Sequence, residues 1–408
     1  MAQQTDIQQG KLVETELPEK LLNERGIRNV EEAKILLNAH RLDLSKAVKK
    51  VYKYELKFVG RIPPETEKDL SRGPKNDVAN QTRRQLLWEM YMQMLSSNPN
   101  TFGDKSDFRN YLYDCGINFY SNTSLNMVMG EVRIFPIDRT LLPADLHGYL
   151  GRRVEKITAN LLYCEEIDLR ELGKLSESRS RSAVQFLDIL SSQEIIKKNR
   201  HYIFPPKVFE KANEIRLKND PRILKEGFEK NVRIVGDNLE DATPIIQIDH
   251  KMSAFFPEVT VDEFLSKFLT GHEPDLGRRI FSQMHTATKQ IKGLSVVATH
   301  LEVPRTFTVY GLTPVAAKEI TFDLPDGAHI SVVDYIERRY NRRIRHPNLP
   351  CVIENIGSKK VIKKSFYPIE LVKIVAGQRV NFDQQTPGLL DKITALKDRR
   401  TFLKLIMR

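Results

Sequence analysis

Alternating apolar and polar side chains predict several strands along the chain. Residues 46–60 ("KAVKKVYKYELKFVG") show this alternation and predict a strand, whose packing candidates are Val51, Tyr54, Leu56 and Phe58. A strand is also predicted in residues 125–137, and residues 232–249 predict a hairpin with a Gly-Asp turn. Three later stretches, "LSVVATHLEV", "TFTVYGL" and "KEITFDL", predict short strands at the spacing of a small barrel.

Apolar side chains at helical spacing predict helices between these strands. Residues 82–97 ("TRRQLLWEMYMQMLSS") predict an amphipathic helix, and its apolar stripe belongs to the core: Leu87, Met90, Tyr91 and Met94. Residues 71–81 ("SRGPKNDVANQ"), just before it, predict a loop. Residues 173–196 predict a Ser/Arg-containing linker that runs into a helix, and residues 30–40 predict a helical piece without a clear partner. The fold class predicted is α+β.

Length and composition indicate a soluble protein of more than one domain. A chain of 408 residues is too long for a single core, and its 40% hydrophobic and 29% charged residues are ordinary for globular proteins. No apolar run is long enough to predict a membrane span, and the polar N-terminus does not predict secretion. The cysteines Cys115, Cys164 and Cys351 are odd in number and far apart, which predicts reduced thiols and a cytoplasmic and/or nuclear location.

Positive charge is concentrated in one part of the chain. Residues 335–380 hold 11 Lys and Arg against three acids, a net charge of +8, out of +11 for the whole sequence. A localised basic field of this kind is typical of proteins that bind phosphate polymers. A solvated surface that keeps the protein soluble is the alternative interpretation.

A search for catalytic motifs finds little. The sequence has no Gly-rich phosphate loop, HExxH, CxxC pair or Gly-x-Ser-x-Gly. His272 and Glu273 are adjacent but lack a second histidine at helical spacing, so they predict a loop. No metal site and no cofactor are predicted, although a carboxylate site built from distant residues stays open.

The densest cluster of cations and aromatic residues is "YIERRYNRRIRHPNLPC", residues 335–351. A helix is predicted from about Ser331, with Val332, Ile336 and Tyr340 on the buried face. The adjoining face then carries Tyr335, Arg338, Arg339 and Arg342. Arginine donates two parallel hydrogen bonds to phosphate, and aromatic rings stack on bases. This helix therefore predicts contact with single-stranded nucleic acid.

Several motifs resemble the PAZ domain of Argonaute proteins. They are "IKGLSVVATH", "TFTVYGLTP", "YIERRYNRRIRHPNLPCV" and "KKSFYPIELVKIVAGQRV". Upstream, "VYKYELKF", "RRQLLWEMYMQ" and "FGDKSDFRNYLYDCG" resemble the Argonaute N domain, while "RSAVQFLDILSSQ" and "IQIDHKMSAFFPE" resemble the first linker and the strand entering PAZ. The sequence "YPIELVKIVAGQRV" is similar to the corresponding motif in the worm-specific branch of the family.

The resemblance implies a division of the chain and a fold. The implied parts are an N-terminal extension (1–45), an N-like domain (46–165), a first linker (166–250), a PAZ domain (251–380) and the start of a second linker (381–408). PAZ is implied to be an OB-like β-barrel with an inserted hairpin-helix clamp. Residues 388–408 resemble the second linker, and nothing in the sequence resembles MID or PIWI domains, so no slicer activity is expected. A natural short protein and a fragment of a longer Argonaute both stay open.

The resemblance also implies the site residues. Such a domain holds the two-nucleotide 3′ end of a guide RNA in small-RNA-mediated gene silencing. Phosphate contacts are implied for His300, Arg305, Phe307, Tyr335 and Tyr340, and a clamp on the last nucleotide for Phe322, Lys363 and Phe366. Arg339 joins them from the basic helix face.

Three positions depart from the family's pattern. Phe307 and Phe366 stand where tyrosine is usual, and Ile336 stands where an aromatic residue is common. Each lost hydroxyl removes a neutral hydrogen bond of about 0.5–1.5 kcal/mol. The alternatives to RNA binding are a protein-interaction scaffold with a decayed pocket, working with silencing-pathway proteins, and a nuclease completed by a partner chain.

Overall fold

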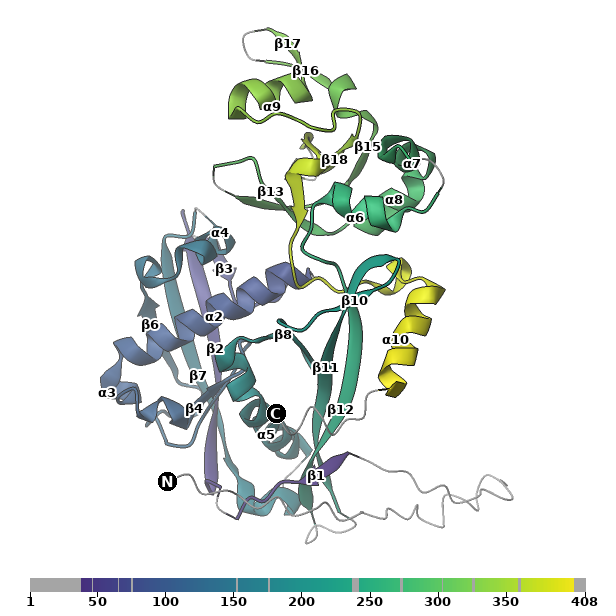
Figure 1. Ribbon diagram of the computed structural model, residues 1–408. Coiled ribbons are helices and arrows are strands. Elements are labelled where there is room, and N and C mark those ends of the chain that lie inside the picture. Colours follow the sequence, from purple (N-terminus) through teal and green to yellow (C-terminus); the bar gives the residue numbers. More distant parts are fainter. Residues whose placement is uncertain are drawn as a thin grey trace.

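A computed structural model of the chain describes residues 38–45, 47–64, 66–74, 76–151, 153–174, 177–236, 242–271, 274–302, 304–324, 327–358 and 361–399. Within these ranges the chain mixes helices and strands, as the α+β prediction requires (Figure 1). The pair His272 and Glu273 and most of the helical piece expected over residues 30–40 lie outside the described residues. The end of that helical prediction is wrong, because Ala39–Arg41 form strand β1. No described helix combines the length and the apolar character needed to cross a membrane.

The first lobe is built on an antiparallel sheet in the order β4-β5-β2-β7-β6, with β3 added beside β2. Its strands are β2 (Lys50–Ile62), β3 (Thr66–Asp69), β4 (Tyr111–Tyr113), β5 (Asn118–Ser121), β6 (Val132–Ile137) and β7 (Lys156–Asp168). Short helices connect them: α3 (Pro99–Phe102), α4 (His147–Leu150), η1 (Asp107–Asn110), η2 (Arg139–Leu141), η3 (Ala144–Leu146) and η4 (Leu169–Lys174). The strand predicted over residues 125–137 is shorter, because it begins only at Val132.

Helix α2 (Asp77–Ser97) packs on one face of this sheet, and its predicted core stripe is confirmed. Leu87, Met90, Tyr91 and Met94 are all buried. The predicted loop over residues 71–81 is wrong in its second half, because the helix begins at Asp77. The Asn76 side chain accepts a hydrogen bond from the Ala79 amide at 3.1 Å, and this cap starts the helix within the polar stretch.

The second sheet forms a long ribbon beside the first lobe. Its strands are β1 (Ala39–Arg41), β8 (His201–Phe204), β9 (Lys207–Glu210), β10 (Ile215–Leu217), β11 (Asp220–Val235) and β12 (Thr243–Phe255). Strands β11 and β12 pair antiparallel over their length, which confirms the predicted hairpin, although most of its turn lies outside the described residues. Helix α5 (Glu177–Lys198) fills the space between this ribbon and the first sheet (Figure 1), so the expected Ser/Arg linker is largely helical.

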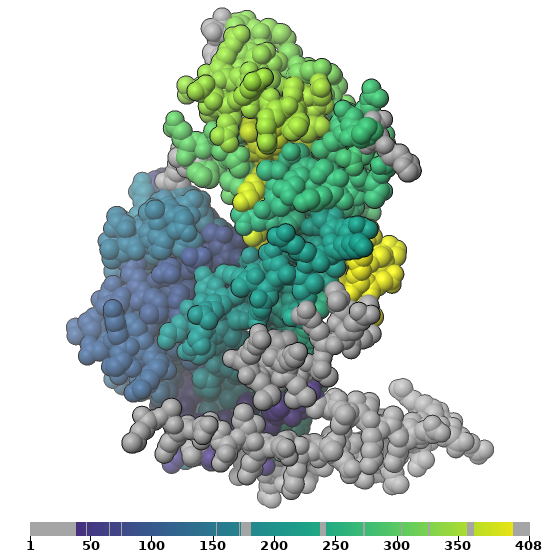
Figure 2. Space-filling view, viewed as in Figure 1, coloured from purple at the N-terminus to yellow at the C-terminus, as the bar shows by residue number. Residues whose placement is uncertain are grey.

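The upper lobe, residues 256–378, projects from the rest of the molecule (Figure 2). Its helices are α6 (Val261–Phe268), α7 (Leu276–Ser282), α8 (Met284–Ile291), α9 (Val332–Tyr340), η5 (Ala317–Glu319) and η6 (Ile369–Leu371). Its strands are β13 (Ser295–Ala298), β14 (Arg305–Thr308), β15 (Gly311–Ala316), β16 (Thr321–Asp323), β17 (His329–Ser331), β18 (Pro350–Ser358), β19 (Val361–Pro368) and β20 (Val372–Ile374).

The pairing of these strands gives two small sheets and a hairpin. One sheet has the order β14-β13-β20, the other β15-β18-β19, and β16 pairs with β17. The hairpin and helix α9 lie between β15 and β18 at the far end of the lobe (Figure 1), where a hairpin-helix insertion was expected. Among the described residues these pairings do not close into one barrel.

The chain enters and leaves the upper lobe at one point. Phe255, at the end of β12, forms an antiparallel bridge with Arg379. After this crossing come η7 (Phe382–Gln384) and α10 (Pro387–Arg399), which packs beside β12 (Figure 1). The buried Arg222 pairs with Asp220 at 2.7 Å and donates to the Gln384 carbonyl at 2.8 Å, so the returning segment is fixed to the ribbon.

Candidate nucleic-acid interface

Helix α9 presents the predicted aromatic and basic residues because its two ends are defined by capping. The Ser331 hydroxyl accepts a hydrogen bond from the Asp334 amide at 3.0 Å and begins the helix. Val332 and Ile336 are buried, as predicted. The helix ends at Tyr340 because Asn341 adopts a left-handed conformation with φ of 49°. Arg342 therefore lies beyond the helix, and its predicted place on the helix face is wrong.

An uninterrupted series of aromatic rings crosses the upper lobe. Phe307 on β14 stacks on Tyr367 of β19, with ring centroids 4.6 Å apart. Tyr367 is 6.0 Å from the ring of His300, which follows β13, and His300 meets the edge of Tyr340 at 5.0 Å. Rings from two strands, from the segment that follows β13 and from helix α9 are thus brought into contact.

The series continues from helix α9 to the hairpin. Tyr340 and Tyr335 lie 6.2 Å apart at an interplanar angle of 83°. Tyr335 then meets Phe322 of β16 at 5.2 Å and 74°. Phe307, Tyr367, His300, Tyr340, Tyr335 and Phe322 are called the ring series below. The structure brings together five of the residues singled out in the sequence, and adds Tyr367.

Phe366 and Tyr367 are neighbours on β19 and belong to different clusters. Side chains alternate along a strand, so these two rings point to opposite sides. Phe366 packs with Phe322 and Tyr335 in the cluster around Ile336, whereas Tyr367 packs in the larger core that contains Phe307. Ile336 fills the centre of the first cluster and is 3% exposed, which explains why an aliphatic side chain stands there.

The buried carboxylate of Glu354 holds one end of the ring series. Its Oε1 accepts a hydrogen bond from the Arg305 guanidinium at 2.7 Å, and its Oε2 accepts one from the Tyr367 hydroxyl at 3.0 Å. Burial, followed by the charge of Glu354, raises the pKa of Tyr367 to about 12. Sequence reasoning missed both Glu354 and Tyr367. Their only signal was a polar residue within an otherwise apolar strand opposite "SFYP".

His300 lies in the middle of the ring series as a neutral side chain with an open hydrogen-bonding position. Its Nδ1 is buried and has no hydrogen-bond partner among the described residues. Burial, and after it the positive charge of Arg342, lowers the pKa of His300. Buried polar atoms are normally paired, so this nitrogen is suited to a hydrogen bond with a bound group.

The Tyr340 hydroxyl in the middle of the series remains a hydrogen-bond donor at neutral pH. Burial, and after it the neighbouring Tyr335, raises the pKa of Tyr340. A protonated phenol can donate to a phosphate oxygen or a ribose hydroxyl without carrying charge. The series therefore combines stacking faces with neutral donors.

Free cations border the series. Arg339 on α9 and Lys363 on β19 are exposed, and neither side chain forms a hydrogen bond or ion pair with another described residue. Arg345, by contrast, lies 3.4 Å from Glu370 and is partly neutralised. Among the predicted site residues, Arg339 and Lys363 make no ring contact with the series, and Arg305 meets it through Glu354.

The described residues were also compared with the requirements of metal and thiol sites. Those residues contain no group of three or more His, Cys, Asp or Glu placed to hold a metal ion. Cys115, Cys164 and Cys351 are free thiols, as predicted. Burial raises the pKa of Cys115 to about 12, so this thiol is poorly suited to nucleophilic chemistry.

Comparison with known proteins agrees with this geometry. The PAZ domain model matches residues 263–387, which contain every residue of the ring series. The Caenorhabditis elegans Argonaute protein wago-1 is 25% identical over 349 residues, covering 78% of this chain and 35% of that protein. Rice (Oryza sativa subsp. japonica) protein argonaute 12 is 32% identical over 136 residues, 33% of this chain and 12% of that protein. The chain thus spans about a third of the length of the worm relative.

The chain is also similar to parts of solved structures. Kluyveromyces polysporus Argonaute with a guide RNA is 13% identical, with a TM-score of 0.47, and the match covers 90% of this chain and 41% of that one. A Drosophila Ago-PAZ domain in complex with 3′-end 2′-O-methylated RNA is 25% identical, with a TM-score of 0.24, and the match covers 29% of this chain and 99% of that domain.

Proposed function

Since the chain carries a PAZ domain and belongs to the Argonaute family, we propose that it binds the 3′ end of a small single-stranded RNA through the ring series. The observation that carries the proposal is the association of six rings with the open Nδ1 of His300. The role proposed is guide-RNA binding in gene silencing, without cleavage by this chain.

The chemistry of an RNA 3′ end fits this surface. A terminal nucleotide offers a base face, ribose hydroxyls and a phosphodiester, which stacking rings, neutral donors and cations can bind. Tyr335 and Phe322 supply faces near the tip of the lobe, while Tyr340 and His300 supply neutral polar groups. Arg339 and Lys363 are free to approach phosphates from the rim.

The proposal extends to the organisation of the chain. We assign residues 46–165 to an N-like domain, 166–250 to a first linker, 251–380 to PAZ and 381–408 to the start of a second linker. The two small sheets of the upper lobe are proposed to be parts of an OB-like barrel. Support for this comes from the hairpin and α9, which are inserted between β15 and β18.

Fluorescence anisotropy tests the function directly. Duplexes of equal length, one blunt and one with a two-nucleotide 3′ overhang, are titrated with the purified chain. The overhang duplex should bind more tightly, because only it offers unpaired bases. Equal affinity would contradict recognition of the end and would leave charge alone as the source of binding. No affinity for either would favour the scaffold alternative.

Two substitutions separate the ring series from general charge. Tyr335→Ala and Phe322→Ala should each weaken binding by about 1–3 kcal/mol, the range for a lost stacking contact. Lys318→Ala removes an exposed charge on η5 and serves as the control, which should alter mainly the salt dependence. A loss for Lys318→Ala as large as that for Phe322→Ala at every salt concentration would contradict the assigned site.

A further inference from the structure

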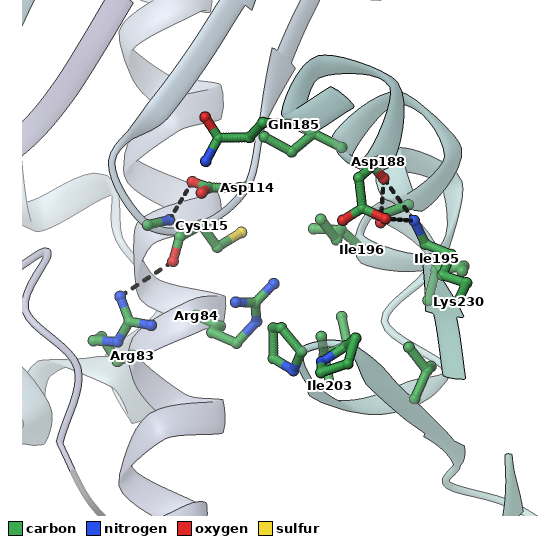
Figure 3. Close-up of a pocket in the computed structure, with 16 residues that line it drawn as sticks. Arg83, Arg84, Asp114, Cys115, Gln185, Asp188, Ile195, Ile196, Ile203 and Lys230 are labelled. Atoms are coloured by element: carbon green, nitrogen blue, oxygen red, sulfur yellow. Dashed lines mark hydrogen bonds and ion pairs between the residues drawn. The ribbon is translucent and has the colours of Figure 1, made fainter. Parts of the chain in front are cut away.

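A cavity of about 210 Å³ lies between helix α2, helix α5 and strands β8, β9 and β11, away from the ring series (Figure 3). Two consecutive arginines of α2, Arg83 and Arg84, line one side of it. Figure 3 shows the Arg84 side chain in the space between Cys115 and Ile203. Charged side chains in a partly enclosed space normally have partners that offset their charge.

Arg83 is buried and fully engaged with neutral acceptors. Its Nη1 donates to the Ser71 carbonyl at 2.8 Å and to the Cys115 carbonyl at 3.1 Å, and its Nη2 donates to Asn80 Oδ1 at 3.0 Å. Burial, and after it the charge of Arg84, lowers the pKa of Arg83. The guanidinium is thus held in place by the fold, but no carboxylate offsets its charge.

The Arg84 side chain has neither a hydrogen-bond acceptor nor an ion-pair partner among the described residues. Its Nε is buried without a hydrogen-bond acceptor, and no ion pair there includes its guanidinium. A buried, unpaired donor on a charged group costs free energy, and a neighbouring like charge adds to that cost. An acceptor brought into the cavity would remove both penalties.

The carboxylates that line the cavity are already committed. Asp114 Oδ1 accepts from the amides of Gly116 and Asn118 at 2.7 and 3.1 Å, and its Oδ2 accepts from the Asn118 side chain at 2.7 Å. Asp188 accepts from the Lys230 ammonium at 2.8 Å, and that ammonium also reaches the Asp188 carbonyl and Ser191. Among the described residues that line the cavity, Arg84 is therefore a cation that no carboxylate contacts.

Much of the remaining lining is apolar, and it indicates the kind of ligand. Isoleucines from α5 and a Pro-Pro turn between β8 and β9 form this wall: Ile189, Ile195, Ile196, Pro205 and Pro206. We propose that the cavity binds a small organic oxyanion, a phosphate monoester or a carboxylate, with its charged group on Arg84 and its apolar body on this wall. The planar fork of a guanidinium matches two oxygens of such a group.

Isothermal titration calorimetry with phenyl phosphate tests the proposal on the full chain. Phenyl phosphate should bind more tightly than inorganic phosphate, and benzyl alcohol, which has the ring without the charge, should not bind. Arg84→Gln should weaken phenyl phosphate binding by about tenfold or more. Arg109→Gln makes the same charge change at an exposed residue of η1 outside the cavity, and should leave the affinity unchanged.

A second variant keeps the test valid if Arg84→Gln folds poorly. Gln185 lines the cavity and accepts a hydrogen bond from the Tyr120 hydroxyl at 3.0 Å, which a carboxylate can also accept. Gln185→Glu therefore adds a negative charge without changing shape and should weaken anion binding several-fold. Tyr335→Ala, in the ring series, should not affect it. Wild-type affinity in both cavity variants, or equal binding of benzyl alcohol, would overturn the proposal.

Discussion

Arg305 and Glu354 form an ion pair with 2.7 Å between Nη2 and Oε1, so a cation assigned to RNA is already partnered in the free chain. Glu354 is 7% exposed and also holds the Tyr367 hydroxyl. The carboxylate therefore positions both groups, and it reduces the charge that Arg305 can offer to a phosphate.

Glu354→Gln is expected to release Arg305. RNA affinity should rise, and the slope of log affinity against log salt should steepen by about one unit, because one more cation meets phosphate. The free chain should lose about 1–3 kcal/mol of stability through the weakened buried hydrogen bonds. Anisotropy titrations at several salt concentrations measure the slope, and an unchanged slope would show that Arg305 stays away from the RNA.

Phe307→Tyr is expected to strengthen RNA binding. Phe307 is 6% exposed and stacks on Tyr367. The resemblance to PAZ domains implies a tyrosine at this position. A new hydroxyl that reaches the terminal phosphate should add about 0.5–1.5 kcal/mol of affinity. Burying that hydroxyl without a partner costs free energy, so thermal stability of the free chain should fall slightly. Unchanged affinity would place the phosphate elsewhere.

The free energy of unfolding should decrease as the pH falls below the ordinary histidine pKa of 6.5. The pKa of His300 is lowered from its ordinary value of 6.5 by burial, and that of His201 is lowered in the same way. A histidine whose pKa is lower in the folded chain takes up its proton first in the unfolded chain. Its contribution to stability is therefore complete above the unfolded pKa and is lost as the pH falls through the folded pKa.

His300→Gln should therefore flatten the dependence of Tm on pH below about 6.5. His285→Gln, at an exposed position of α8, is the matched control and should reproduce the wild-type curve. Differential scanning calorimetry between about pH 8 and pH 5 gives both curves. Parallel curves for wild type and His300→Gln would mean that His300 titrates alike in the folded and unfolded chain.

Arg379→Ala should loosen the attachment of the upper lobe. The guanidinium donates to Asp77 at 3.0 and 3.1 Å and lies 3.9 Å from the Phe204 ring centroid, so it joins three parts of the chain. Its loss should cost about 1–3 kcal/mol of stability. A double-mutant cycle with Asp77→Ala isolates the pair, and Arg338→Ala, exposed on α9, is the control. Additive effects would mean that the two residues are not coupled.

The chain is expected to leave RNA intact in the presence of Mg²⁺ or Mn²⁺. Two-metal hydrolysis needs several carboxylates that hold the ions about 3.5–4 Å apart. End-labelled RNA, paired and unpaired, is incubated with metal and compared with an EDTA control. Metal-dependent product that co-purifies with the protein, and disappears when one Asp or Glu is replaced, would contradict this expectation.

Local periodicity was sufficient to predict the elements that pack on a single face. Tyr54, Leu56 and Phe58 alternate along β2 and lie in the core beneath α2, while Val51, on the other parity, packs toward α5. The prediction of one strand for "TFTVYGL" is wrong, because this stretch forms parts of two strands, β14 and β15. Tyr310 lies between them and is 49% exposed, so the chain turns where the pattern alone indicated continuity.

The candidate site was predictable where a motif or a helical face identifies it. Tyr335 and Tyr340 follow from the period of α9, but its end does not, because the left-handed Asn341 depends on one residue's conformation. Glu354 and Tyr367 could not be found from spacing, since their roles come from pairing between β18 and β19. Arg84 was missed because a charge on an amphipathic helix normally faces solvent.

The bridge between Phe255 and Arg379 holds the two ends of the upper lobe side by side. A short glycine-containing turn could therefore replace residues 256–378 over a small distance, but it would uncover Leu224 and Leu389, which are buried in the core of the lobe. The chain thus enters and leaves the upper lobe at one place, yet the base of the lobe shares its hydrophobic core with β11 and α10, so a substitution in that core should change the stability of both parts.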